Sequence, residues 1–259
     1  MGEVMEAFYL PDGDGFVATG LAGGPWDPGW QHGGPPSALL GGAMARLCPD
    51  SLLARVVVSL ERPVPVGRVD IGAEVVRSGR SVSHLAARLT VDGRVLVRAT
   101  GLAVHRRDDA EPSPLACEPW PEPETLSDYT LPFFRREVGY HRAVDLRVAR
   151  GRWGDTPVGF WARSRVPLVA GRALLPIEHV LILADAESGL GPPLDPDTWS
   201  FVNPDLVLHV ARTPGSGWLG FDIHSMTGPD GAGWSASEIR DDDGPFGRSA
   251  QALVVRPRS

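Results

Sequence analysis

The sequence predicts an α+β fold in which one unit, a helix packed on an antiparallel sheet, occurs twice. The first observation is the order of elements, because each half contains one apolar helical segment followed by a series of strand-like runs. The second is a weak internal repeat with an offset of 150 residues, which places Val56–Leu60 on Leu206–Val210 and Gly67 on Gly217. Repetition of one supersecondary unit is the simplest explanation of both observations.

The first helix is expected over residues 37–47, directly after Pro35 and Pro36. Prolines suit a helix start, because a residue in the first turn has no intrahelical hydrogen bond to lose there. Gly41 and Gly42 lie inside the helical pattern and indicate a close approach to another backbone or to a ligand.

Strand patterns surround the first helix. Apolar runs of this length, alternating or continuous, are typical of strands. The expected strands are Phe16–Thr19 before the helix and, after it, Val56–Leu60, Arg68–Val76, Val82–Val91 and Arg94–His105. Asp92 and Gly93 separate the last two and are typical of a tight hairpin, so an antiparallel meander is expected.

The stretch Arg106–Thr130 differs from both halves, because it is rich in proline and acidic residues. Such a composition is typical of a connecting segment. The chain is therefore expected to divide into an N-terminal unit of residues 1–107, a linker of residues 108–130 and a C-terminal unit of residues 131–259.

The second half repeats the pattern of the first. Its expected strands are Gly139–Trp153 and Val158–Val166 before a helix and Asp205–Arg212, Trp218–Ser225, Gly233–Arg240 and Gly247–Val255 after it. Two such sheets can join edge to edge, which removes exposed edge strands.

The stretch PIEHVLILADAESG, Pro176–Gly189, predicts the second helix, which is apolar on nearly its whole circumference and should be buried. Pro176 suits its start and Gly189 its end. Asp185 lies inside it, near the C-terminal end, where the helix dipole disfavours a negative charge. A buried carboxylate needs partners, because an unpaired charge is costly to desolvate. Asp185 is thus a candidate functional residue, with a solvent-facing position as the alternative.

Composition excludes several classes of function. The net charge of −7 and the lack of a basic block argue against nucleic acid as the main partner. All 25 basic residues are arginines, so Schiff-base chemistry on a lysine is excluded. No apolar run is long enough to span a membrane, the N-terminus has no secretory pattern, and two cysteines make neither a disulfide framework nor a zinc pattern. A cytoplasmic protein is expected.

Four segments of the chain, His32–Leu40, Ala184-Asp185, Asn203–Arg212 and Ala250–Arg256, together resemble thioesterase-II-like (TesB-type) acyl-CoA thioesterases. His32–Leu40, HGGPPSALL, resembles the Gly-Gly helix start in the first half of these enzymes, and Ala184-Asp185 resembles the Asp of their second helix. Asn203–Arg212 resembles the strand whose start carries a Thr, and Ala250–Arg256 resembles the last strand, which carries the active-site Gln. The resemblance covers essentially the whole chain and implies a double hotdog fold, two copies of a long helix wrapped by an antiparallel sheet.

The resemblance also implies a catalytic set. In the family an Asp, a Thr and a Gln hold and activate a water, and by position these are Asp185, Asn203 and Gln251 here. Asn203 departs from the family's Thr, since an amide can hold a water but lacks the geometry and reach of a hydroxyl. A shift of the alignment by a few residues would make Ser200 the polar partner instead.

Hydrolysis of a thioester needs a positioned water, a base and donors for the carbonyl oxygen in the transition state. Asp185 can deprotonate the water and Gln251 can hold it, although a strand Gln often only satisfies a neighbouring backbone group. The N–H groups of Gly33 and Gly34, at a helix start, are candidate oxyanion donors, with a tight turn as the alternative. His32 is a candidate lining residue, with an ordinary surface position as the alternative.

The expected function is hydrolysis of acyl-CoA to free acid and CoA by an activated water, within fatty acid metabolism. The alternative is a non-catalytic acyl-CoA or acyl-chain binding protein of the same fold. No G-x-S-x-G and no metal-ligand spacing occurs, so neither metal nor cofactor is expected. A hotdog dehydratase or hydratase ranks last, because it would need a paired His and carboxylate, and His179 is six residues before Asp185 on another helix face.

The residues that line the substrate-binding site can be predicted only in part. The candidates for an acyl tunnel are Trp26, Trp30, Phe160, Trp161 and Trp199. Arginines are candidates for the CoA phosphates, but with 25 along the chain none can be singled out. The expected partner is acyl-CoA, without insertion into a membrane, and a homo-oligomer is left open.

Overall fold

The first half of the chain contains one long helix and six strands. The computed structural model describes residues 7–107, 109–111 and 117–258. The elements of the first half are β1 (Tyr9–Asp12), β2 (Gly15–Ala18), α1 (Gly34–Leu47), β3 (Ser51–Leu60), β4 (Arg68–Ser78), β5 (Val82–Val91) and β6 (Arg94–His105). β5 and β6 have the bounds expected from the sequence, and Asp92 and Gly93 between them have positive φ angles of 50° and 75°, as a two-residue hairpin turn requires.

The second half contains seven strands and two shorter helices. They are β7 (Val144–Arg150), β8 (Val158–Ser164), α2 (Pro176–Ala184), α3 (Glu187–Leu190), β9 (Trp199–Val202), β10 (Asp205–Val210), β11 (Leu219–Thr227), β12 (Ala232–Asp241) and β13 (Gly244–Pro257). Short 3-10 turns cover Gly20–Ala22, Pro123–Thr125 and Tyr140–Arg142. Strands β1 and β9 were not predicted, and β7 is shorter than the expected Gly139–Trp153. Four-residue strands such as β1 and β9 are too short for a clear alternating pattern.

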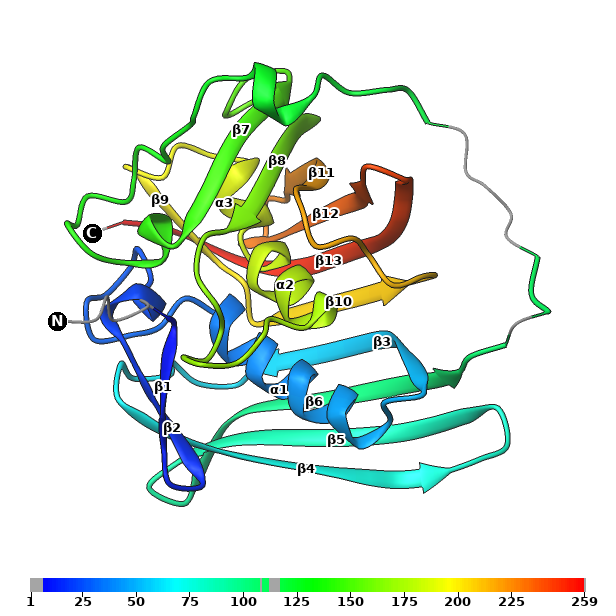
Figure 1. Cartoon of the computed structure of the whole chain (residues 1–259). Coiled ribbons are helices and arrows are strands. Elements are labelled where there is room, and N and C mark those ends of the chain that lie inside the picture. Colours follow the sequence, from blue (N-terminus) through cyan, green and yellow to red (C-terminus); the bar gives the residue numbers. More distant parts are fainter. Residues whose placement is uncertain (1–6, 108, 112–116, 259) are drawn as a thin grey trace, which may run out of the picture.

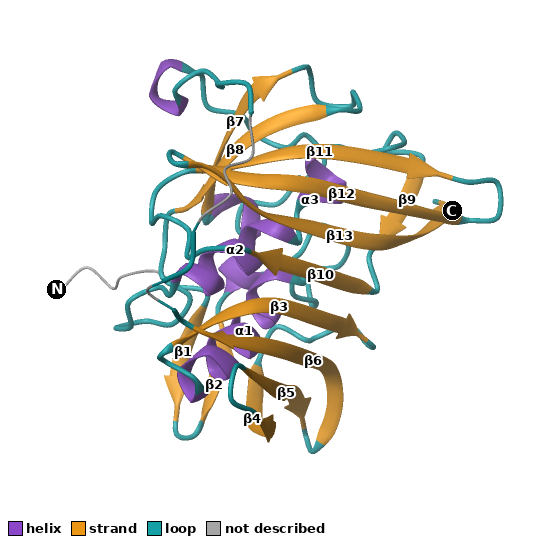
Figure 2. Ribbon diagram, turned by 90° about the vertical axis from the view of Figure 1, so that its right-hand side faces the viewer, coloured by secondary structure: helices purple, strands orange, loops and turns teal. Residues whose placement is uncertain are grey.

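Both halves arrange their strands in the same order within one antiparallel sheet (Figure 1). From the outer end inward the order is β1-β2-β4-β5-β6-β3 in the first half and β7-β8-β11-β12-β13-β10 in the second. β3 and β10 meet in the middle, where Val56 lies opposite Leu208 and Val58 opposite Leu206. The prediction that two antiparallel sheets join edge to edge is confirmed, and Figure 2 shows the helices behind the joined sheet.

The outer ends of the two half-sheets are also connected. The N–H of Tyr9 in β1 donates to Leu168 O at 2.9 Å, and the N–H of Ala170 donates to Tyr9 O at 2.9 Å. Leu168 and Ala170 lie in the segment between β8 and α2. The first strand of one half is therefore hydrogen-bonded to the segment that leads into the helix of the other half. Hydrogen bonds thus link the halves here as well as between β3 and β10, which helps to fix the residues that lie between them.

The two larger helices pack against each other through glycines. A Cβ on Gly41 would collide with the side chain of Leu181, and one on Gly42 would collide with the carboxylate of Glu178. A close approach was predicted for this glycine pair and is present, but the groups approached are side chains of α2 rather than a backbone or a ligand. Glu178 is buried but satisfied, because its Oε1 accepts from Arg46 at 2.7 Å and its Oε2 from the N–H of Leu175 at 2.8 Å.

The second helix is shorter than predicted. Instead of continuing to Gly189, α2 ends at Ala184, and Asp185 occupies its C-cap. The Ala184 carbonyl accepts a hydrogen bond from Nε2 of Gln251 at 3.0 Å, so a tertiary contact takes the place of the next helical bond. Gly189 lies inside α3, where a Cβ would be 2.9 Å from the ring of Phe133. Only α1, with 14 residues, is a long helix, and no helix in the described residues could span a membrane.

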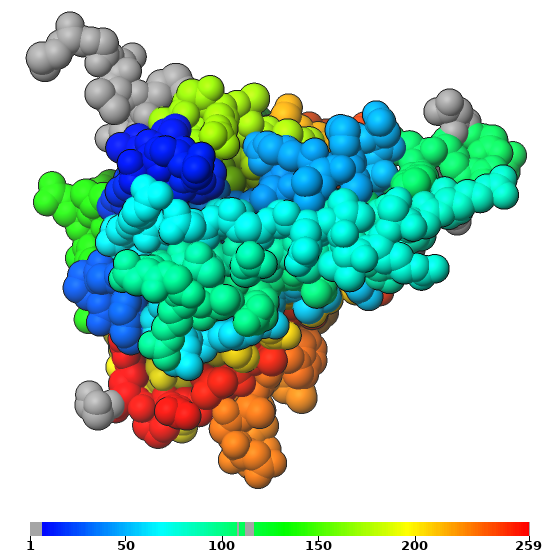
Figure 3. All heavy atoms as spheres, turned by 90° about the horizontal axis from the view of Figure 1, so that it is seen from below, coloured from blue at the N-terminus to red at the C-terminus, as the bar shows by residue number. Residues whose placement is uncertain are grey.

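The outer face of the sheet differs between the halves. Figure 3 shows β4, β5 and β6 as a broad surface in cyan to green. On the second half, Trp120 from the segment before β7 packs edge to face on Trp161 at 5.3 Å, and Nε1 of Trp161 donates to Pro121 O at 2.9 Å. Part of the expected linker is therefore packed on the second half. The division of the chain at residues 107 and 131 stays a prediction.

Candidate active site

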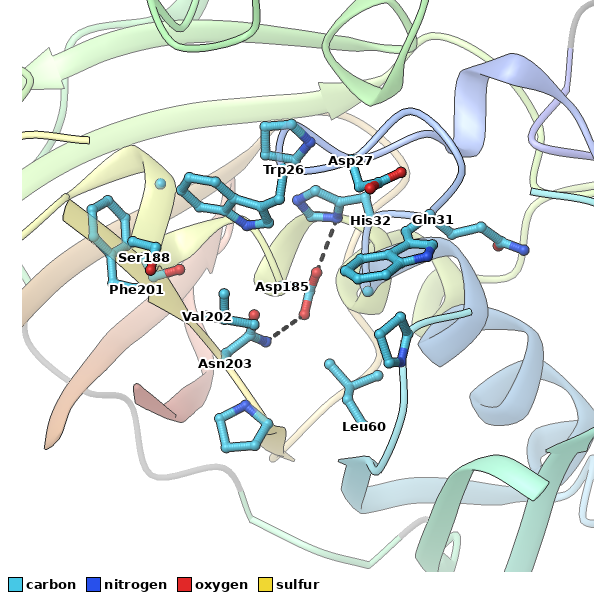
Figure 4. Close-up of a pocket in the computed structure, with 18 of the residues that line it drawn as sticks. Trp26, Asp27, Gln31, His32, Leu60, Asp185, Ser188, Phe201, Val202 and Asn203 are labelled. Carbon is cyan, nitrogen blue, oxygen red and sulfur yellow. Dashed lines mark hydrogen bonds and ion pairs between the residues drawn. The ribbon is translucent and has the colours of Figure 1, made fainter. Parts of the chain in front are cut away.

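A cavity of about 470 Å³ opens between the two halves. The first half contributes the loop before α1 and the end of β3, and the second half contributes the α2–α3 junction and the β9–β10 turn. The walls are largely aromatic and aliphatic, whereas His32, Asp185 and Asn203 bring buried or half-buried polar groups to one place (Figure 4). Within the described ranges, no group of three or more His, Cys, Asp or Glu side chains is placed to hold a metal ion.

Asp185 is the buried carboxylate of this cavity, with 3% of its surface exposed. Its Oδ1 accepts from Nδ2 of Asn203 at 2.7 Å, and its Oδ2 lies 2.9 Å from Nδ1 of His32. A Cβ on Gly33 would be 2.8 Å from both oxygens, so only a glycine lets the backbone approach the carboxylate this closely. The alternative of a solvent-facing Asp185 is wrong, and each oxygen has a partner from a different element.

His32 is held from three sides, although it lies in a loop. The backbone N–H of His32 donates to Ala22 O at 2.8 Å. The imidazole ring stacks on the ring of Tyr140, with a centroid distance of 3.9 Å and an interplanar angle of 5°. Burial raises the pKa of Tyr140 well above its usual value, so the hydroxyl stays protonated and donates to Ile182 O at 2.9 Å. The side chain of His32 is 11% exposed, so the ordinary surface position considered for it is wrong.

The position of the imidazole proton follows from the contacts of Nδ1. This nitrogen lies 2.9 Å from Asp185 Oδ2 and 3.2 Å from the backbone nitrogen of Gly34. One ring nitrogen cannot donate to the carboxylate and accept from an N–H at once. A lone pair facing a carboxylate would be repulsive, so we assign the proton to Nδ1 of His32, which donates to Asp185. The N–H of Gly34 is then free to serve another acceptor.

Asn203 lies in the turn between β9 and β10 and is the residue that reaches Asp185. Besides its bond to the carboxylate, Nδ2 of Asn203 approaches Asp205 O at 3.3 Å. Both contacts use the amide nitrogen, which leaves Oδ1 as an acceptor for a water. Ser200, the alternative partner, lines the cavity but donates its hydroxyl to Arg256 O at 3.3 Å. The alignment that puts Asn203 at this position is therefore consistent with the geometry.

Gln251 lies behind the cavity rather than on its wall. It is 2% exposed, and Nε2 donates to the carbonyl of Ala184, the residue before Asp185. Because a carbonyl can only accept, this bond fixes which end of the amide is the nitrogen. Oε1 is buried and has no hydrogen-bond partner among the described residues. Gln251 thus contacts the segment that carries Asp185, as an anchor of its backbone.

The two glycines at the start of α1 have different surroundings. Gly33 lines the cavity, whereas a Cβ on Gly34 would collide with the backbone oxygen of Ile182 in α2. A larger side chain at position 34, as in Gly34→Val, is therefore expected to disturb the fold by forcing the two helices apart. Pro35 and Pro36 have no N–H, so the backbone donors at this helix start are those of Gly33 and Gly34.

The reasoning from sequence did not single out a second carboxyl group, Glu187. Its side chain is fully buried beside the α2–α3 junction, and its Oε2 accepts from Ser237 at 2.5 Å and Ser249 at 2.9 Å. Burial, and secondarily the charge of Asp185, raises the pKa of Glu187 to about 8, against the lowering effect of the two hydroxyls. The signal in the sequence was the set of serines on inward-facing strand positions, where apolar residues are usual.

Asp185 does have a histidine partner, but this partner comes from the first half of the chain and is not His179. His179 does lie away from Asp185, and its Nε2 accepts from the N–H of Ser164 at 3.1 Å. Burial, with a smaller effect of Arg163, lowers the pKa of His179 to about 4, so it stays neutral. The partner is His32, which is 153 positions earlier in the sequence, and only the packing of α1 against α2 brings it close.

Two of the five predicted aromatic wall residues line the cavity. Trp26 stacks on Phe133 at 6.0 Å and meets Phe201 edge to face at 5.7 Å (Figure 4), and Trp30 also lines the cavity. The other three predicted wall residues are not on it: Phe160, Trp161 and Trp199. Phe160 and Trp161 are both buried residues of β8, and neither side chain lines the cavity.

A second, smaller hollow of about 220 Å³ adjoins the cavity and shares Phe133 and Phe134 with it. Three arginines line it: Arg135, Arg136 and Arg258. Arg135 is paired with Asp197 at 2.6 Å, whereas Arg258 donates to Pro196 O at 2.7 Å and lies over the Trp26 ring at 5.3 Å. The hollow therefore carries an excess of positive charge in a chain whose net charge is −7.

Family models cover most of the chain. Residues 22–104 match the acyl-CoA thioesterase N-terminal domain, and residues 114–255 match the acyl-CoA thioesterase C-terminal domain. A search of curated proteins finds no match to the sequence.

Solved structures share the fold at low sequence identity. A proposed thioesterase from Novosphingobium aromaticivorans DSM 12444 is 22% identical over 95% of this chain and 98% of its own, with a TM-score of 0.76. A protein of unknown function with a hotdog fold from Alicyclobacillus acidocaldarius is 18% identical over 97% and 96%, with a TM-score of 0.74. Acyl-CoA thioesterase II TesB2 from Mycobacterium marinum is 16% identical over 82% and 83%, with a TM-score of 0.61. The chain therefore has a hotdog fold.

Proposed function

The chain belongs to the TesB-like acyl-CoA thioesterases, and from this premise we propose that Asp185 activates a water that hydrolyses the thioester of acyl-CoA to free acid and CoA. The observation that carries the proposal is the buried carboxylate of Asp185, held in the cavity between His32 and Asn203. A desolvated carboxylate with fixed orientation is suited to accept a proton from a water beside it.

The proposed reaction has two steps. Asp185 takes a proton while the oxygen of the water bonds to the thioester carbonyl carbon, which gives a tetrahedral intermediate. The C–S bond then breaks, the carbonyl forms again, and the proton on Asp185 passes to the CoA sulfur. The hydrogen bonds from His32 and Asn203 occupy one lone pair on each carboxylate oxygen, so further lone pairs remain for the proton.

Asn203 is proposed to hold the water together with Asp185. Its Nδ2 is committed to the carboxylate, so its Oδ1 is the acceptor that can orient a water hydrogen. For Gln251, which lies behind the cavity, we propose that it supports this arrangement through the Ala184 carbonyl, to which its Nε2 donates. The three predicted catalytic positions thus retain a role in one reaction.

The carbonyl oxygen of the substrate is proposed to lie at the start of α1. The N–H groups of Gly33 and Gly34 point from a helix N-terminus, where the partial positive charge favours a developing oxyanion. Gly33 lines the cavity beside Asp185, so base and donors flank a common space. The imidazole of His32 adds a polar wall to the same space.

The substrate is proposed to lie across both hollows, with its acyl chain against Trp26, Trp30 and Phe201 and its phosphates near Arg136 and Arg258. An arginine fork matches a phosphate group, and Arg258 is already oriented by Pro196 and Trp26. We expect Arg136→Gln and Arg258→Gln to raise KM for acyl-CoA about 3- to 10-fold and to leave KM for an acyl-N-acetylcysteamine thioester unchanged. Arg62→Gln, on the main cavity wall, is the matched control, and an equal effect there would contradict the assignment.

The alternative is a non-catalytic acyl-CoA binding protein of the same fold. Two observations favour it: position 203 is an Asn, and Gln251 is not among the residues that line the cavity. The decisive experiment measures release of free thiol by the purified protein across acyl-CoA chain lengths, together with acyl-CoA binding by calorimetry. Turnover at any chain length supports the enzyme, whereas binding without thiol release supports the binding protein. A cytoplasmic location and the oligomeric state stay predictions.

A further inference from the structure

A buried polar cluster lies directly behind Asp185, on the side away from the cavity. Its centre is Glu187, at the start of α3, whose Oε2 accepts from Ser237 on β12 and Ser249 on β13. Neither the serines nor the glutamate lines the cavity. The cluster is therefore separate from the groups that meet the substrate, but only Ala186 separates its carboxyl group from Asp185 in sequence.

The surroundings of Glu187 favour its neutral form. The side chains that the neighbouring strands direct to the inner face are uncharged: Ser225, Ser235, Ser237, Ser249 and Gln251. The charged residues that alternate with them lie on the other face: Asp222, His224, Glu238 and Arg248. Phe133 and Trp153, which contact α3 at Gly189, are also uncharged. Among the described residues, the charge that acts on Glu187 is that of Asp185, and it opposes ionisation.

Two buried oxygens in this region lack a partner among the described residues, Oε1 of Glu187 and Oε1 of Gln251. Ser249, which donates to Glu187, lies two residues before Gln251 on the same face of β13. Gln251 in turn donates to Ala184, three residues before Glu187. Both side chains are thus attached to the same strand and to the same helix junction.

A single proton satisfies both oxygens. The hydroxyls of Ser237 and Ser249 also lie 2.8 Å from each other, so their two hydrogens are shared among three contacts and Oε2 of Glu187 accepts at least one of them. We place the acid proton on Oε1, the oxygen that has no partner among the described residues. Oε1 of Gln251 can only accept, because its amide nitrogen is bound to the Ala184 carbonyl. We propose that Glu187 is a positioning residue for the proposed hydrolysis: as a neutral acid it donates from Oε1 to Oε1 of Gln251, directly or through one buried water. Gln251 is then locked on Ala184, and Asp185 is held towards the cavity.

The proposal has a consequence for pH. With a pKa of about 8, Glu187 is neutral at pH 7 and loses its proton above pH 8. An ionised Glu187 can only accept, so Gln251 loses its donor and a second negative charge appears beside Asp185. The turnover number should therefore fall on the alkaline side with an apparent pKa near 8.

The test is the pH dependence of kcat for a short-chain acyl-CoA, corrected for hydrolysis without protein. Glu187→Gln keeps a donor that cannot ionise, so it should retain turnover at pH 7 within a few-fold and lose the alkaline decline. Glu187→Ala removes the donor and should lower kcat at all pH values by about tenfold, with KM unchanged. Glu178→Gln, at a buried glutamate in the first turn of α2, is the matched control and should keep the wild-type pH profile.

An alkaline decline that persists in Glu187→Gln would overturn the proposal, and so would an unchanged kcat in Glu187→Ala. Infrared spectroscopy gives a readout that does not need activity, since the band of a protonated carboxyl group at pH 7 should be lost in Glu187→Gln. A wild type that shows this band but hydrolyses no acyl-CoA would refute the proposed function and, with it, the positioning role. A wild type that hydrolyses acyl-CoA but lacks the band would refute the proposal on Glu187 alone.

Discussion

The two half-sheets have the same register but different chemistry on their inner faces. In the first half, Leu85 lies opposite Gly101 and Ala87 opposite Ala99. The residues 150 positions later form the same cross-strand pairs, Ser235 with Gln251 and Ser237 with Ser249. Every apolar member of the first set is replaced by a polar one in the second. One unit therefore encloses its helix in an apolar core, whereas the other contains a polar cluster.

The difference shows how a duplicated fold can separate stability from chemistry. Around Gly101, a Cβ would lie 2.9 Å from Leu53 and 2.9 Å from the sulfur of Met44, so the core of the first half is densely packed. In the second half, part of the interior is occupied by polar side chains, whose burial is unfavourable unless they are hydrogen-bonded. The candidate site needs both, because the first half supplies His32 and Gly33 and the second supplies Asp185.

The largest expected effect tests whether the chemistry lies in the second half. Asp185→Asn keeps the size of the side chain and removes the base, so thiol release should fall by at least about 100-fold while the protein stays folded. Asp70→Asn, on β4 of the first half, is the control and should change turnover little. Turnover by Asp185→Asn close to that of the wild type would show that the comparison assigns the chemistry to the wrong group.

The second prediction concerns the stability of the polar half. A carboxyl group with a folded pKa of about 8, against 4.5 when unfolded, binds a proton that the unfolded chain releases between these values. The free energy of unfolding should therefore fall as pH rises from 5 to 8 and level off above pH 8. Glu187→Gln has no such proton. Between pH 5 and pH 8 the free energy of unfolding of the wild type should therefore fall by about 2–4 kcal/mol relative to that of the variant. Parallel urea unfolding at each pH measures it, and equal slopes would contradict it.

The third prediction tests the dense packing of the first half. Gly101→Ala places a methyl group against Leu53 and Met44 and should lower the free energy of unfolding by about 1–3 kcal/mol. Hydrolysis should remain, because Gly101 does not line the cavity. Gly67→Ala is the matched control, since nothing lies within 4 Å of the added carbon at that position. Equal stability of the two variants would show that the first core has spare room.

The smallest effect comes from making one polar pair resemble its apolar counterpart. Ser237→Ala introduces the alanine that the first half has at the equivalent position, Ala87. The change also removes one hydrogen-bond donor to Glu187 and should lower the free energy of unfolding by about 1 kcal/mol. Because this hydroxyl lowers the pKa of Glu187, its loss should also shift the alkaline decline of turnover to higher pH. Thermal unfolding and a pH profile of kcat measure the two effects. A shift of the decline to lower pH would contradict the assigned network.

Several elements follow from local sequence alone. β5 and β6 have the predicted bounds, because alternating apolar residues on both sides of Asp92-Gly93 leave one register for a hairpin. Pro176 marks the start of α2, and the close packing predicted from Gly41 and Gly42 is present. Such features depend on neighbours within a few residues, so their physical causes can be read from the chain.

The sequence by itself therefore determined the repeated order of elements, the hotdog fold that the family resemblance implied, and the candidacy of Asp185 as a functional residue. Only the tertiary structure decided where α2 ends, because the Ala184 carbonyl is bonded by Gln251, 67 positions away. It also decided that Asp185 meets His32 from the other half and that Glu187 lies among serines. These contacts join segments whose distance in sequence carries no periodic signal. Their energies come from burial and hydrogen bonds that exist only once the two halves have packed together.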